Sequence, residues 1–155
     1  MAGSRGVPRS DEVIGRFFDE QRLATTGRRR ERLDRAEADL RTCLEAHAQQ
    51  LLTAPELALL ALERQFDATG AVARVADADA VLLLLPIYLE DHHWFGEDLE
   101  DRRLRILLAE PLAYSIARLP EIRERKVGSA VWTVEAAKEH AVWMLRQERE
   151  AARRG

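Results

Sequence analysis

The feature that most constrains this chain is the spacing of its apolar residues, which recur at intervals of three and four along most of its length. Such spacing places apolar side chains on one face of an α-helix. No stretch alternates apolar and polar residues over six positions between turn residues, as a half-buried strand would. The sequence therefore predicts an all-α fold: a single compact, bundle-like domain of about six to eight helices in residues 10–147. Residues 1–9 are expected to form a flexible tail and residues 148–155 a frayed one.

Turn and capping residues divide the first half of the chain into helices. The first helix is expected over about 11–24, and a Thr-Thr-Gly turn should cap a second helix that continues to residue 51. Thr53 and Glu56 form a capping-box pattern, which predicts the start of a third helix that Gly70 ends. The buried side of that helix is expected to contain Leu57, Leu60, Ala61 and Phe66.

The run from Val81 to Leu85 is apolar on every side, and it predicts the central buried helix. Asp77 or Asp79 is expected to cap this helix, and Pro86 to kink or divide it. A buried strand is the alternative, but no second strand candidate exists to pair with it. Further helices are expected over 99–109, from Pro111 to before Pro120, and after a cap at Ser129 or Thr133 through Leu145.

Cysteine usage and hydropathy narrow the class of protein. The lone Cys43 excludes a disulfide framework and a Cys-based zinc site, and we expect it to be a small buried side chain. No run of 18 apolar residues could span a membrane, and the first ten residues lack the apolar core of a signal peptide. We therefore expect a cytoplasmic protein with no membrane partner.

Charge is unevenly distributed along the chain. Residues 51–110 carry 12 acidic and 5 basic side chains, whereas both ends are mildly basic. A protein that binds duplex DNA over its whole surface would show a basic excess, so any nucleic-acid surface must be local. The best candidate for that surface is the start of the second helix. Its basic residues are Arg28, Arg29, Arg32 and Arg35, and a solvated face on which Glu31 pairs with Arg35 is the alternative.

Four aromatic residues are candidate anchors for a protein partner, because Trp is typical of interface centres. Trp94 and Phe95 lie within an acidic segment, Glu90 to Asp101, that would steer basic partners. Trp132 and Trp143 are eleven positions apart, about three helical turns, so they can share a face. At least one of these two is expected in the core.

Motifs that carry catalysis are missing from the sequence. It contains no Gly-x-Ser-x-Gly, no Gly-x-Gly-x-x-Gly and no Walker A loop, so we expect a non-catalytic protein without a cofactor. The spacing of Glu90 and His93 would place both on one helical face, as in carboxylate-bridged metal sites. This spacing occurs once, whereas those sites use it twice, so a metal-dependent enzyme is the third hypothesis.

The opening of the chain resembles a known family. The segments VIGRFF at 13–18 and RLATTGRR at 22–29, followed by Leu33, Leu40 and Leu44, are similar to the N-terminal core-binding domain of tyrosine recombinases of the phage-integrase type. In that family this helical domain clamps DNA. The Arg, His-x-x-Arg and Tyr constellation of the family's catalytic domain is missing from residues 100–155. The resemblance therefore implies a stand-alone helical domain without recombinase chemistry.

Together these patterns favour a helical protein that acts by binding another macromolecule. The leading hypothesis is a regulatory adaptor whose partner is a protein or a second copy of the chain. The alternative is a small DNA-binding regulator that uses the arginines of the second helix.

Overall fold

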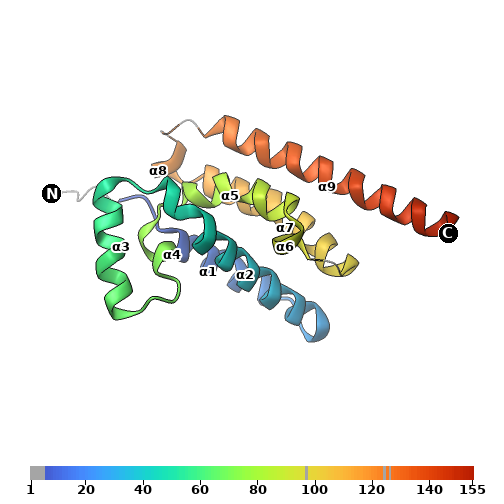
Figure 1. Cartoon of the computed structure of the whole chain (residues 1–155), viewed down its shortest axis with the longest axis horizontal. Helices are drawn as coiled ribbons and strands as arrows, with labels where there is room; N and C mark the ends of the chain where they lie inside the picture. Colours follow the sequence, from blue (N-terminus) through green and yellow to red (C-terminus); the bar gives the residue numbers. More distant parts are fainter. Residues whose placement is uncertain (1–5, 97, 124, 126) are drawn as a thin grey trace.

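The computed structural model of this chain describes residues 6–96, 98–123, 125 and 127–155, and its fold is all-α and bundle-like, as predicted (Figure 1). The side chains of His92 and Phe95 lie outside the described part. The helices are α1 (Ser10–Arg22), α2 (Gly27–His47), the 3₁₀ helix η1 (Ala48–Leu51), α3 (Ala54–Phe66), α4 (Ala71–Val75), α5 (Asp79–Glu90), α6 (His92–Phe95), α7 (Leu99–Ala117), α8 (Pro120–Arg123) and α9 (Gly128–Arg154).

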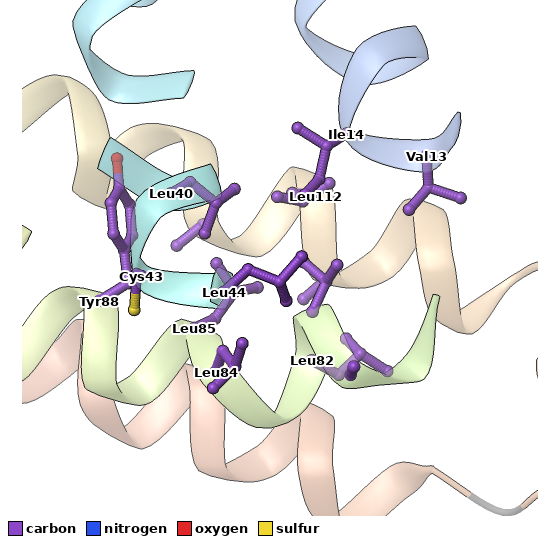
Figure 2. Packing of buried hydrophobic residues seen from close by; sticks show 14 of the residues in the cluster. Val13, Ile14, Leu40, Cys43, Leu44, Leu82, Leu84, Leu85, Tyr88 and Leu112 are labelled. Carbon is purple, nitrogen blue, oxygen red and sulfur yellow. The ribbon is translucent and has the colours of Figure 1, made fainter. Parts of the chain in front are cut away.

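Helix α5 forms the centre of the bundle, as its apolar sequence predicts. It packs against α2, α7 and α9, and Figure 2 shows Leu85 of α5 beside Leu44 of α2. Pro86 lies inside this single helix, so it does not divide the helix, which was one of the two outcomes expected of it. The predicted aspartate cap was also wrong: Ala78 is the N-cap residue, and the Asp77 and Asp79 carboxylates instead accept hydrogen bonds from Arg125.

Helix α7 is longer than the sequence predicts. It runs without interruption from Leu99 to Ala117, so the expected break before Pro111 was wrong. A proline in a helix removes the donor for the carbonyl four residues earlier, here that of Leu107. Both residues are exposed, which leaves that carbonyl on the side where water can hydrate it. The helix can therefore continue through the proline.

Helix α3 begins where the capping pattern predicts. Thr53 Oγ1 accepts a hydrogen bond from the Glu56 amide, and the Glu56 carboxylate accepts one from the Thr53 amide. Gly70 does not end this helix; it has a left-handed φ of 72° and precedes α4. The expected buried side was also wrong: Leu60 is buried, whereas the others predicted with it are exposed, namely Leu57, Ala61 and Phe66.

Residues near both ends of the described chain make defined contacts or belong to a helix. Near the N-terminus, Arg9 pairs with Asp77 at 2.9 Å, and the Ala78 amide donates to the carbonyl of Pro8. The end of the predicted N-terminal tail is therefore attached to the segment before α5. At the other end, α9 continues as a helix through residues 148–154. The second predicted helix ends earlier, at His47, and η1 covers the remainder up to residue 51.

A buried arginine joins α7 to three other helices. Arg105 donates from one terminal nitrogen to the Trp94 carbonyl and from the other to the Asp39 carboxylate. Its guanidinium also lies 5.7 Å from the centre of the Tyr88 ring. A buried charge needs such partners, since water no longer solvates it. Arg105 therefore ties α6, α2 and α5 to the middle of α7.

Candidate protein-interaction surface

The outer face of α9 carries two exposed tryptophans. Val134, Ala137 and Ala141 of this helix are buried against the bundle. Trp132 and Trp143 lie on the opposite side, and their side chains are 68% and 53% exposed. The prediction that these two could share a face agrees with their common exposure, but the expectation that at least one lies in the core was wrong. The Trp143 ring is stacked on that of His140, with ring centres 6.0 Å apart.

A shallow groove lies beside this face, between α7 and α9. The two helices are antiparallel, since Lys138 pairs with Glu110 and Glu148 with Arg102. The groove has a volume of about 310 Å³. We call it the α7–α9 groove, and its lining residues are Arg103, Ile106, Leu107, Val142, Leu145, Arg146 and Arg149. The sequence did not predict this groove, because its residues come from two helices that lie far apart in the sequence.

Of the other predicted anchors, Trp94 lies in the core. It is 8% exposed, and its ring meets those of His47 and His93 edge-on. Trp94 is therefore not part of the candidate surface. The predicted anchor Phe95 has a side chain outside the described part of the structure.

The arginines at the start of α2 divide into two groups. Arg28 and Arg29 are exposed, and neither forms an ion pair within the part of the chain that the structure describes. Arg32 instead pairs with Asp98 at 2.8 Å, and Arg35 with Asp101 at 3.0 Å. The expected pair between Glu31 and Arg35 is thus replaced by one that links α2 to α7.

These ion pairs also reduce the free negative charge of the acidic segment from Glu90 to Asp101. Asp98 is the N-cap residue of α7, and its side chain accepts a hydrogen bond from the Asp101 amide. That bond, followed by the one from Arg32, lowers the pKa of Asp98. Glu100 pairs in turn with Arg103. Part of the acidic charge expected to steer basic partners is therefore neutralised within the chain.

Glu90 and His93 do not share a helical face, contrary to the prediction. Helix α5 ends at Glu90, and the extended Asp91 separates it from α6. Within the residues that the structure describes, no three His, Cys, Asp or Glu side chains lie close enough together to hold a metal ion. Among the described residues, Glu90 and His93 are therefore not joined by the further ligands that a metal ion would need.

Comparisons add no relative from which a function could be transferred. No helix in the described part of the chain is long and apolar enough to cross a membrane. No protein-family model, curated protein or solved structure matches this chain.

Proposed function

We propose that this chain is a non-catalytic, cytoplasmic protein-binding module, a regulatory adaptor whose partner docks on the outer face of α9. The observation that carries the proposal is the joint exposure of Trp132 and Trp143 on one side of one helix. Tryptophan is enriched among the residues that dominate binding energies, because its large rigid ring buries much apolar area at a small entropic cost. Two such rings on one face favour an interface.

The way in which α9 is held supports the same proposal. Its inner residues are buried against α5 and α7 along several turns, so the outer face is presented on a fixed support. Between the tryptophans lies the small, exposed Ala136, which leaves room for a partner to approach the backbone. A surface that is ordered before binding loses less entropy when its partner docks.

The direct test is capture of partners from native lysate, with and without nuclease, by the wild-type chain and by a variant with Trp132→Ala and Trp143→Ala. We expect a discrete set of proteins that survives nuclease and that the double variant loses. Leu23→Ala with Phe66→Ala is the matched control, since both residues are more exposed than either tryptophan and lie outside α9, just after the end of α1 and at the end of α3. Equal capture by the tryptophan variant and the wild type would contradict the proposal.

Nucleic acid is the second candidate partner. Arg28 and Arg29 favour it, because both are exposed and unpaired within the described residues, and the resemblance to core-binding domains points to the same partner. A complex of this kind should weaken steeply with salt. Arg28→Glu with Arg29→Glu should abolish it without breaking an ion pair of the fold. If all captured material disappears with nuclease, this second candidate replaces the first.

A further inference from the structure

The α7–α9 groove has an apolar floor. Ile106 and Leu145 are buried at its base, Val142 is half-buried, and Leu107 is 60% exposed at its edge. Leucine side chains left in water lose the stabilisation that burial would bring, about 25 cal/mol per Å² of apolar surface. An apolar ligand that covered Leu107 and Val142 would recover part of that free energy.

The rim of the same groove is basic. Arg103, Arg146 and Arg149 line it, and none of the other described residues that line it is acidic. In the described part of the chain, Arg146 and Arg149 form no ion pair, and Arg103 pairs with the exposed Glu100. A neighbouring hollow shares Arg103 and Leu107 with the groove, and its lining includes both Arg29 and the acidic Glu100. Among the described residues, the groove therefore has positive charge without an acidic partner on the α9 side of an apolar strip, and the Arg103–Glu100 pair on the α7 side.

The dimensions of the groove fit a helix. Val142 and Arg149 mark its extent along α9. Seven residues of a helix span about 10 Å, or two turns. A seam between two packed helices accepts the ridge of a third helix, whose apolar residues at positions i, i+3 or i+4, and i+7 would lie along the floor.

From these observations we propose that the α7–α9 groove binds an acidic amphipathic helix of a partner protein, with its apolar edge on Leu107 and Val142 and its carboxylates on Arg103, Arg146 and Arg149. The inference rests on the proposed function and gives that partner a chemistry. Carboxylates match the guanidinium groups of the rim, which can bind them in a bidentate manner. Nucleic acid fits less well, because its phosphates would leave the apolar floor uncovered.

The probe is a fluorescein-labelled synthetic peptide of about 18 residues, long enough to form a stable helix when bound. It carries Leu at positions i, i+3 and i+7 and Glu on both sides of this stripe. One control peptide has the same residues with the Leu scattered, and a second has Lys in place of Glu. Fluorescence anisotropy should show at least about tenfold tighter binding of the acidic amphipathic peptide than of either control.

Variants of the chain locate the binding. Leu107→Glu, and separately Arg146→Glu with Arg149→Glu, should each weaken binding by about tenfold or more. The matched control is Arg16→Glu with Arg123→Glu, which makes the same charge change at exposed positions outside the groove and should have no effect. Circular dichroism checks that each variant is folded.

Several results would overturn this inference. They are absence of peptide binding, equal binding of the Lys peptide, binding that survives Leu107→Glu, and displacement of the peptide by duplex DNA. Self-association that Leu107→Glu abolishes would also overturn it, because a second copy would then be the occupant.

The tryptophan variant separates this inference from the proposed function. The groove variants could lose peptide binding while the variant with Trp132→Ala and Trp143→Ala captures partners as the wild type does. This result would contradict the proposed function and support the inference about the groove. If capture depends on the tryptophans and the peptide does not bind, the reverse holds.

Discussion

Helices α5 and α3 are both rich in apolar residues, α5 the more so, and they have opposite positions in the fold. Helix α5 is surrounded by α2, α7 and α9, and most of its residues are buried. Helix α3 lies at the edge of the fold and packs mainly on the short α4 (Figure 1). It leaves Leu62 54% and Phe66 88% exposed. The difference shows that apolar residues in a helix predict burial only when other long helices can surround it.

The largest expected difference in stability is between two leucine-to-alanine substitutions, one in each helix. Leu85→Ala in α5 should lower the free energy of unfolding by about 3 kcal/mol, because it opens a cavity at the centre of the bundle. Leu62→Ala in α3 should change it by less than about 0.5 kcal/mol, because the side chain is already half in water. Urea denaturation measures both values. Equal losses would show that α3 belongs to the core after all.

A second contrast concerns the arginines that attach the two regions. Arg105→Met should lower the free energy of unfolding by about 2 kcal/mol, since it leaves the buried Trp94 carbonyl without its donor. Arg74 joins α4 to Glu63 of α3 through a partly exposed pair at 2.9 Å. Arg74→Met should therefore cost less than about 1 kcal/mol. A larger loss for Arg74→Met than for Arg105→Met in the same denaturation experiment would reverse the comparison.

Burial around α5 should also make the stability of the protein depend on pH. Cys43 of α2 lies against α5, and burial raises the pKa of its thiol to about 12 (Figure 2). An unfolded cysteine has a pKa of about 8.5, so the thiol loses its proton more readily in the unfolded chain than in the folded one. The contribution of the protonated Cys43 thiol to stability is therefore complete below about pH 8.5 and is lost as the pH rises towards 12. Burial raises the pKa of Tyr88 as well, which adds to the loss at higher pH.

Melting temperatures measured between about pH 8 and pH 10 test this expectation. At pH 10 the free energy of unfolding should be lower by about 2 kcal/mol. The Cys43→Ala variant should begin less stable and show a flatter decline. The native thiol should also resist a disulfide reagent until the protein unfolds. Rapid modification of Cys43 in the folded protein would contradict its burial against α5. An equal fall of the melting temperature with pH in the wild type and in Cys43→Ala would contradict it as well.

The cap of α3 should give a local effect that hardly changes global unfolding. Thr53→Ala removes one half of the capping box and should destabilise this helix by about 1 kcal/mol. Because α3 contributes little to the core, the loss should show as faster amide hydrogen exchange within residues 54–66, with little change in global unfolding. Slower or unchanged exchange there, with a drop in global stability, would indicate that α3 unfolds together with α5.

Local patterns in the sequence predicted much of the fold. The capping box of Thr53 and Glu56 lies within four residues, so its geometry follows from the chain alone. The all-apolar run before Pro86 likewise predicted the central helix. Pro111 misled the prediction, because its effect depends on whether the carbonyl at Leu107 can reach water, and that depends on the whole fold.

The candidate surface was less predictable, since it depends on long-range contacts. Arg32 and Arg35 meet acidic partners about 66 positions away, so the sequence could not separate them from the unpaired Arg28. The spacing of Trp132 and Trp143 indicated a common face, but spacing alone could not say which side of α9 the bundle covers. The α7–α9 groove combines residues about 40 positions apart, and no local pattern marks it.

The central claim is that a protein docks on the outer face of α9, and site-specific photo-crosslinking from Ala136 tests it most directly. Ala136 is exposed between the two tryptophans, so a photoreactive side chain there would lie inside the interface. The account predicts a discrete protein adduct that resists nuclease and disappears in the Trp132→Ala, Trp143→Ala background. The same probe at the exposed Glu20 of α1 should give no such adduct. Identical adducts from both positions, or none from Ala136, would contradict the account.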